Sequence, residues 1–424
     1  MSIKDYEWDI DGCLRCSLCK WVNPWQFSDE RFLRICPAIS RYQWDSYSAH
    51  GKLDVAKAIL TGILDPLKSA SVADIVYKCN LCGGCDVMCK RNLDLDVLPA
   101  LKSIREFMWD KNLTPKSLCD VAANIKKNGS VWPTAGERGK WAEGLDIKEA
   151  TEGDIDVLLY AGCAFSGKSE TTTSIRSLAG LLQKAGANFG TLGDKEICCG
   201  APLAKMGAVR EFTEVAKKNI EQIKATGASV VVTPCADCYA AIKVDYARVA
   251  FEEKFEIPFE VLSGVEYLER LMGDGKLSPG RSQKLKVTWH DPCHLGRLSE
   301  PYIPWEGKRV AYGQTVPKKE LRRGTHGCYD PPRNIIKAIP GVELVEMVRI
   351  RENAWCCGAG GGVRDYDPSF ARWTADKRIE EALTTGADAL VTACPWCEAV
   401  LSEAAEGRIE VLDLAELVEK SMEE

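Results

Sequence analysis

Apolar residues recur at helical spacing in the first quarter of the chain. Two such stripes stand at Val55, Ala58, Ile59 and Ile63 and at Val97, Leu101, Ile104 and Met108. Apolar positions three or four residues apart lie on one face of a helix. The pattern therefore predicts a helical front segment, whose stripes pack into a core.

Beyond residue 150 the pattern changes and then repeats. Short apolar runs alternate with helical segments, and "IEQIKATGASVVVTPCADC" (220–238) matches "IEEALTTGADALVTACPWC" (379–397) without a gap. The run at 259–272 likewise matches 409–422, and 155–163 has the outline of 285–293. Strands that alternate with helices indicate βαβ units with a mostly parallel sheet. We expect two duplicated α/β domains, with ligands at the carboxyl ends of their strands.

The division into domains follows from these two patterns. Turn-forming residues gather between about 111 and 150, at Asn128-Gly129, Pro133, Gly136 and Gly144. We therefore expect a helical domain at 1–110, a linker at 111–150, and α/β domains at 151–278 and 279–424. The fold class is then α+β multidomain.

Composition narrows the function. The 424 residues are 46% hydrophobic and carry a net charge of −6, which argues against a nucleic-acid binder. The start shows no signal-peptide pattern, and no run of eighteen apolar residues occurs, so we expect a cytoplasmic protein whose only membrane contact is through a partner. Twenty cysteines in such a chain indicate metal or redox chemistry rather than disulfides.

Eight of these cysteines lie in the front segment, in the spacing C-x2-C-x2-C, then Cys36-Pro37, then C-x2-C-x2-C-x3-C. The pattern resembles two-cluster ferredoxins, in which the fourth ligand of each [4Fe–4S] cubane comes from the other motif. We assign Cys13, Cys16, Cys19 and Cys89 to one cubane, and Cys79, Cys82, Cys85 and Cys36 to the second. Zinc, the alternative ligand, fits two triplets-plus-one poorly. The helical stripes favour an α-helical ferredoxin. Sixteen residues separate Cys19 from Cys36, and Lys90 replaces the usual proline.

Each α/β unit carries five more cysteines, two of them adjacent. The sets are Cys163, Cys198, Cys199, Cys235 and Cys238, and Cys293, Cys356, Cys357, Cys394 and Cys397. Neighbouring cysteines rarely form a disulfide with each other, because the ring is strained. Both side chains could instead reach one multi-metal centre, which the following glycines let the backbone approach. Five thiolates exceed the needs of one cubane or one zinc ion.

The duplicated pattern resembles the cysteine-rich CCG domain of the heterodisulfide reductase family. Cys199-Gly200 and Cys357-Gly358 carry its signature, and "HDPCHLGR" (290–297) and "PPRNIIKAIPGVELVEM" (331–347) resemble its C-terminal copy. The whole chain is similar to the fused ferredoxin-plus-two-CCG subunit. The resemblance implies a noncubane [4Fe–4S] cluster in each five-cysteine set, beside the two cubanes. It also implies disulfide reduction, with electrons from a flavoprotein or iron–sulfur partner in a hetero-oligomeric complex.

A second function stays open. Related subunits only transfer electrons within a larger flavoprotein, 2-hydroxy-acid dehydrogenase or aromatic acyl-CoA reductase complex. Two insertions suggest such specialisation: the aromatic one after Cys19, and one after Cys293, where sixty-two residues precede the cysteine pair against thirty-four in the first unit. Each could be a solvated loop or a docking loop for a partner. The chain itself should bind no flavin or NAD, because "GAGGGV" follows a cysteine pair rather than a strand.

A few other residues lie beside these motifs. His290 and His294 flank Cys293, where a histidine could donate a hydrogen bond to a cluster sulfur or deliver a proton to a thiolate, or only have a structural role. Arg333 could bind a substrate anion or form a salt bridge. Cys119 and Cys328 belong to no motif and are expected to be free buried thiols.

Overall fold

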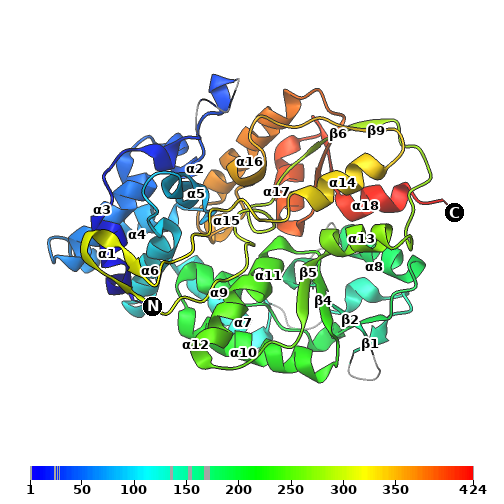
Figure 1. Cartoon of the computed structure of the whole chain (residues 1–424), viewed down its shortest axis with the longest axis horizontal. Coiled ribbons are helices and arrows are strands. Elements are labelled where there is room, and N and C mark those ends of the chain that lie inside the picture. The colour runs from blue at the N-terminus through cyan, green and yellow to red at the C-terminus, as the bar shows by residue number, and fades with distance from the viewer. Residues whose placement is uncertain are drawn as a thin grey trace.

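A computed structural model describes residues 2–22, 25, 27, 29–133, 137–150, 155–166 and 172–423. Its helical front and its two α/β domains lie against one another, with the front at one side (Figure 1). Within these residues no helix combines the length and the apolar character that crossing a membrane requires.

The front segment is helical, as predicted. Its α-helices are α1 (Glu7–Asp11), α2 (Pro37–Tyr42), α3 (Ala49–Leu60), α4 (Ala70–Tyr77), α5 (Gly84–Lys90) and α6 (Val97–Asp110). The whole predicted stripe of α6 is buried. The stripe predicted for α3 is wrong in phase. The buried apolar residues include Leu53 and Ala56, which the prediction omitted, whereas the predicted Ile63 lies beyond the end of the helix and is 84% exposed.

The segment expected as a linker contains ordered elements. Helix α7 (Lys116–Asn128) ends at Gly129, and β1 (Lys148–Glu149) pairs in parallel with β3 of the first α/β domain. The turn residues at 128–129 therefore end a helix, and the chain then joins the edge of a sheet. The domain boundaries drawn from the sequence stay predictions.

The first α/β domain has a parallel sheet in the order β1-β3-β2-β4-β5. Its further strands are β2 (Val157–Leu159), β3 (Phe189–Thr191), β4 (Val230–Thr233) and β5 (Glu260–Ser263). Its helices are α8 (Thr172–Lys184), α9 (Ala201–Met206), α10 (Val209–Ala225), α11 (Ala236–Ala240), α12 (Tyr246–Glu253) and α13 (Gly264–Gly273).

The second α/β domain repeats this arrangement, with a parallel sheet in the order β11-β10-β6-β9. Its strands are β6 (Leu285–Trp289), β9 (Val342–Leu344), β10 (Ala389–Thr392) and β11 (Glu410–Asp413). Its helices are α14 (Asp330–Ala338), α15 (Val363–Tyr366), α16 (Pro368–Leu383), α17 (Pro395–Ala405) and α18 (Leu414–Lys420). The matched sequence segments form matching elements, which confirms the predicted duplication.

The two α/β domains pack through helices on their facing sides. Helix α8 contacts α18, and α13 contacts α14 (Figure 1). Ser177 on α8 donates a hydrogen bond to Glu419 on α18 at 2.5 Å, and Asn334 on α14 donates one to Glu269 on α13 at 2.6 Å. These contacts bring the corresponding ends of the two sheets toward each other.

The insertion after Cys293 packs on the helical domain of the same chain. We call residues 301–327 the strap; it contains an antiparallel hairpin of β7 (Lys308–Arg309) and β8 (Thr315–Val316). Arg309 pairs with Asp9 at 3.1 Å, and Lys319 forms an ion pair with Asp96. The yellow hairpin lies beside α1 in Figure 1. The strap therefore has partners within the chain, which neither sequence interpretation included. In the other insertion, residues 23, 24, 26 and 28 lie outside the described residues.

Candidate functional site

The first four-cysteine group lines one cavity at the edge of the helical domain. We call Cys13, Cys16, Cys19 and Cys89 the outer set; their neighbours in the cavity wall include His50 and Leu53. The cavity measures about 360 Å³, including the part open to solvent. Cys16 is exposed, whereas Cys19 and Cys89 are buried. The structure thus brings together the four thiols that the spacing assigned to one cubane.

The second four-cysteine group has no exposed member. We call Cys36, Cys79, Cys82 and Cys85 the inner set. Burial raises the pKa of the Cys85 thiol well above its usual value, and the other three members add to that shift as close neighbours. Helix α5 carries a cysteine of each set: Cys85 belongs to the inner set, and Cys89, one turn later, belongs to the outer set. One turn moves the second thiol about 5.4 Å along the helix axis, so the two thiols can reach different groups.

The five cysteines of the first α/β domain converge beyond the carboxyl ends of its strands. Cys163 follows β2, and Cys235 follows β4 and precedes α11. The thiol of Cys199 is a hydrogen-bonding neighbour of Cys198 and Cys238. Arg138 donates to Cys163 Sγ at 3.5 Å, and Gly200 N–H donates to Cys198 Sγ at 3.4 Å. All five thiols are buried.

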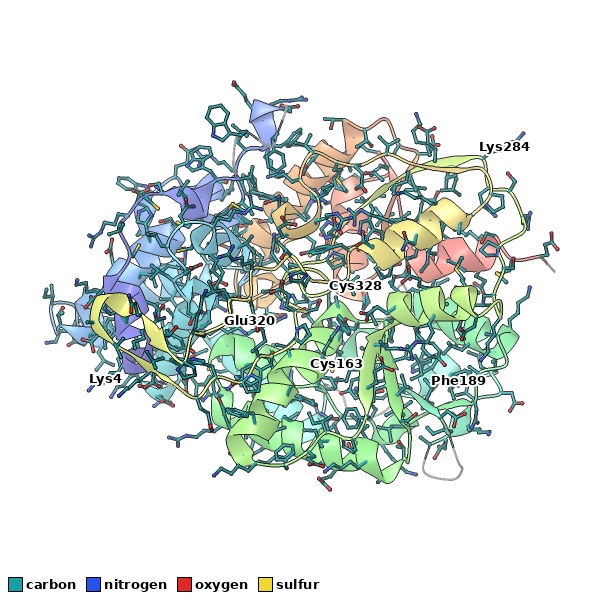
Figure 2. The ribbon with its side chains drawn as sticks, viewed as in Figure 1. Lys4, Cys163, Phe189, Lys284, Glu320 and Cys328 are labelled. Atoms are coloured by element: carbon teal, nitrogen blue, oxygen red, sulfur yellow. The ribbon has the colours of Figure 1, made fainter. Side chains whose placement is uncertain are left out.

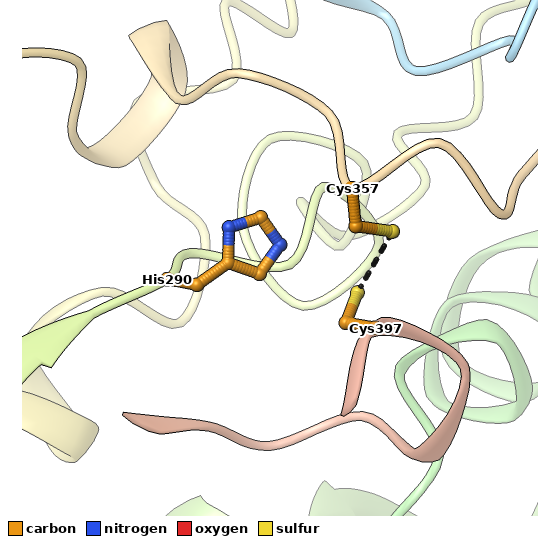
Figure 3. Close-up of side chains that lie close together, drawn as sticks. All are labelled: His290, Cys357 and Cys397. Atoms are coloured by element: carbon orange, nitrogen blue, oxygen red, sulfur yellow. Dashed lines mark hydrogen bonds between the residues drawn. The ribbon is translucent and has the colours of Figure 1, made fainter. Parts of the chain in front are cut away.

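The second α/β domain gathers its five cysteines in the same place. Cys357 and Cys397 have their sulfurs 3.1 Å apart (Figure 3), and Gly358 N–H donates to Cys356 Sγ at 3.3 Å. Cys293 Sγ lies 3.3 Å from His294 Nδ1. The adjacent cysteines thus direct their thiols to neighbouring positions of one cluster of sulfurs.

His290 faces this cluster as a hydrogen-bond donor. A ring nitrogen of His290 and the sulfurs of Cys357 and Cys397 lie within 4.8 Å of one another. Arg378 Nε donates to His290 Nδ1 at 3.0 Å. Arginine only donates, so Nδ1 accepts and the proton of the neutral ring sits on Nε2, which points toward the two sulfurs in Figure 3. That nitrogen can donate to a sulfur but has no lone pair for a metal. Buried Glu381 pairs with Arg378 at 2.8 Å.

The four groups adjoin one another. The charge of Cys19 in the outer set helps to raise the pKa of Cys85 in the inner set, so these two groups are neighbours. Cys82 of the inner set is a hydrogen-bonding neighbour of Cys356, and Cys235 is one of Cys394. Sulfurs therefore continue from the helical domain into the second α/β domain and across to the first. Thiolates are the ligands of iron–sulfur clusters, so the chemistry and burial of these donors fit such clusters. The role of each cysteine as a ligand stays a prediction.

His294 belongs to an ion-pair network that the sequence did not indicate. Its Nδ1 lies 3.0 Å from Asp237, which also pairs with Lys205 Nζ at 2.6 Å. Asp237 stands inside the Cys235–Cys238 motif, so the network joins the two α/β domains beside their cysteines. The one feature of the sequence that could have indicated the network is the acidic residue, Asp237, between the two cysteines.

The other residues singled out from the sequence lie outside the four groups of cysteines. Arg333 binds Asp291 through two hydrogen bonds of 2.8 and 2.9 Å and also pairs with Glu346, which is the salt-bridge alternative. Cys119 is only half-buried and donates to a carbonyl at 3.6 Å. Cys328 is buried between the two α/β domains, where its sulfur is 3.9 Å from Ser263 Oγ (Figure 2).

Comparisons with known proteins agree with this architecture. Residues 9–93 match the 4Fe-4S dicluster domain family, and residues 157–243 and 287–402 match the cysteine-rich domain family. The chain is 31% identical to the D chain of the dihydromethanophenazine:CoB--CoM heterodisulfide reductase of Methanosarcina acetivorans, over 98% of this chain and 94% of the relative.

More distant relatives share the same span. The EtfAB:quinone oxidoreductase of Syntrophomonas wolfei is 25% identical over all of this chain and 60% of its own length. One subunit of the fumarate reductase (CoM/CoB) of Methanothermobacter marburgensis is 25% identical over 97% of this chain and 72% of its own. A crystal structure of a hypothetical protein from Helicobacter pylori matches with a TM-score of 0.53 at 11% identity, over 99% of this chain and 73% of that one, and supports the fold alone. The chain therefore belongs to the heterodisulfide reductase family, among its iron–sulfur subunits that join a dicluster domain to two cysteine-rich domains.

Proposed function

We propose that this chain accepts electrons from a partner protein and reduces a disulfide at its two five-cysteine sites. The outer and inner sets would each hold a cubane [4Fe–4S] cluster, and the two five-cysteine sets would each hold a noncubane one. When bound, these clusters supply one-electron storage and transfer. The observation that supports the proposal best is the adjacency of the four groups of thiols.

The outer set and the inner set differ in their exposure and in their neighbours, which suggests different roles for them. The outer set has an exposed cysteine, Cys16, whereas the inner set adjoins Cys356 of the second α/β domain. A partner, proposed as a flavoprotein or iron–sulfur component of a hetero-oligomeric complex, would therefore dock near the outer set. The inner set would connect that edge to the α/β domains.

The two five-cysteine sites adjoin at Cys235 and Cys394. A disulfide bound between them could therefore receive electrons at both of its sulfurs. Reduction breaks the S–S bond with two electrons from the partner and two protons from water. His290 holds a proton on Nε2 facing Cys357 and Cys397, where a hydrogen bond favours negative charge on sulfur.

A matched pair of cysteine variants tests the proposal. Cys357→Ala removes a thiol of the second five-cysteine set, whereas Cys328→Ala removes a buried thiol outside every set. In oxygen-free preparations, Cys357→Ala should lose a noncubane paramagnetic signal and the reduction of 2-hydroxyethyl disulfide by the dithionite-reduced protein. Cys328→Ala should keep both. Persistence of signal and turnover in Cys357→Ala would contradict the assignment.

A second candidate function is electron transfer without disulfide chemistry. It is favoured by the similarity of the whole chain to part of the EtfAB:quinone oxidoreductase, whose name records a quinone acceptor. The same assay separates the two. A chain that only transfers electrons should be reduced by dithionite and lose its electrons to a quinone, but should not turn over the disulfide.

A further inference from the structure

Two buried arginines beside the inner set have no carboxylate partner among the residues that the structure describes. Arg105 is fully buried and Arg297 is 4% exposed. Among the described residues, neither guanidinium has a carboxylate oxygen within 4.0 Å. Other buried arginines, such as Arg333 and Arg349, do have one.

Arg297 connects the inner set to the second five-cysteine set. Its Nε donates to the carbonyl of Cys82 at 2.6 Å, and its Nη1 donates to the carbonyls of Glu352 and Ala354, both at 2.8 Å. Cys82 belongs to the inner set, and Ala354 lies two residues before Cys356. The Nη2 atom is buried and has no hydrogen-bond partner in the part of the chain that the structure describes. The guanidinium therefore stands between two loops that carry thiols.

Arg105 is held by carbonyls near the same inner set. Its Nη2 donates to the carbonyl of Cys79 at 2.7 Å, and its Nη1 donates to those of Lys205 at 2.8 Å and Gly361 at 2.5 Å. These carbonyls belong to all three domains. Both arginines thus contact the backbone of an inner-set cysteine.

The charge of these groups needs an anionic partner. A guanidinium cannot lose its proton in a protein, and a buried charge is costly unless it is paired. Carbonyl dipoles offset only part of that cost. The thiols whose charge would most affect these arginines are Cys82 and Cys293 for Arg297 and Cys79 for Arg105, and each of them would be an anionic thiolate when it holds a cluster. An iron–sulfur centre becomes more negative when it gains an electron, so a fixed cation beside it favours the reduced form.

We propose that Arg297, together with Arg105, raises the reduction potential of the centre held by the inner set. Both are positioning residues, because they bond the backbone carbonyls of the inner-set cysteines and act on the thiols through the electric field of their charge. The inference rests on the proposed cubane at the inner set, but not on disulfide reduction. It implies that the inner centre holds electrons more firmly than it would without these charges.

The test is a redox titration, monitored by electron paramagnetic resonance, of the full chain purified without oxygen. The signal of the inner centre is identified as the one that Cys36→Ala removes. Arg297→Gln should lower the equilibrium constant for its reduction at least about tenfold, which for one electron corresponds to about 59 mV. Arg297→Lys keeps the charge but cannot make all three carbonyl bonds, and should stay near the wild type. The outer centre should shift less than the inner one.

Several results would overturn the inference. They are an unchanged potential in Arg297→Gln, equal shifts in the Gln and Lys variants, equal shifts at both centres, and a Cys36→Ala variant that loses no signal. If Arg297→Gln loses iron, Arg105→Gln and Arg105→Lys are titrated in the same way. Loss of the inner centre from both Gln variants but neither Lys variant would support the role of charge; loss from all four would refute it. A Cys357→Ala variant that keeps its signal and turnover would refute only the disulfide function.

Discussion

Gly361 allows the glycine run after Cys357 to touch the loop of the inner set. A methyl group added at Gly361 would lie 2.4 Å from the carbonyl oxygen of Cys79, and the residue has φ +66°. Alanine in this left-handed conformation costs about 1–2 kcal/mol, and the forced displacement of a packed neighbour costs about 1–3 kcal/mol more. Gly361→Ala should therefore destabilise the protein by about 2–5 kcal/mol in total.

Gly386 offers a matched control for this prediction. It has φ +65°, but nothing lies within 4 Å of an added methyl group, so Gly386→Ala should carry only the backbone cost. One kcal/mol lowers the melting temperature of a domain of about 150 residues by about 2–4 °C. Calorimetry of the oxygen-free protein should place Gly361→Ala about 10 °C below the wild type and Gly386→Ala about 4 °C below it. Equal shifts in the two variants would refute the close contact with Cys79.

Three further predictions concern buried charges and the strap. Glu381→Gln leaves buried Arg349 and Arg378 without their carboxylate, so it should lower the free energy of unfolding by about 3–5 kcal/mol. Glu380→Gln removes only an exposed ion pair and should lower it by at most about 1 kcal/mol. Similar losses in denaturant unfolding of the two variants would contradict the pairing. Burial raises the pKa of Asp413 to about 8, so the folded state binds more protons than the unfolded state, and stability should fall as pH rises from about 4 to about 8. Asp413→Asn should flatten this slope in melting curves taken from pH 5 to 9, and an unchanged slope would exclude Asp413 as its source. Joint replacement of Arg309 and Lys319 by alanine should make residues 301–327 the first site of limited proteolysis; a wild-type cleavage pattern would show that these ion pairs do not hold the strap.

Local spacing predicted much of the candidate site. The ferredoxin-like spacing, in which the fourth ligand of each cubane comes from the other motif, assigned Cys85 to the inner set and Cys89 to the outer set, and the structure has them one helical turn apart on α5. The repeat likewise predicted which strands end at Cys235 and Cys394. These features depend on residues close in the chain, and short-range geometry is what periodicity and spacing report.

Contacts between distant segments were not predictable in this way. His290 takes its tautomer from Arg378, and Arg297 meets Cys82 across more than two hundred residues. No local pattern distinguishes an arginine that will be buried against carbonyls from one on the surface. The predicted stripe of α3 was wrong for a different, local reason: the helix ends at Leu60, so Ile63 lies beyond its apolar face.

The strap has a mechanical consequence. It begins and ends in the second α/β domain, yet Arg309 in its hairpin pairs with α1, and Lys319 after the hairpin pairs with Asp96 before α6. The helical domain is thus held by the strap as well as by its junction, and both attachments oppose the swinging motion of a tethered carrier. We expect transfer between its thiols and those of the α/β domains to need no domain motion, so solvent viscosity should leave the internal rate unchanged.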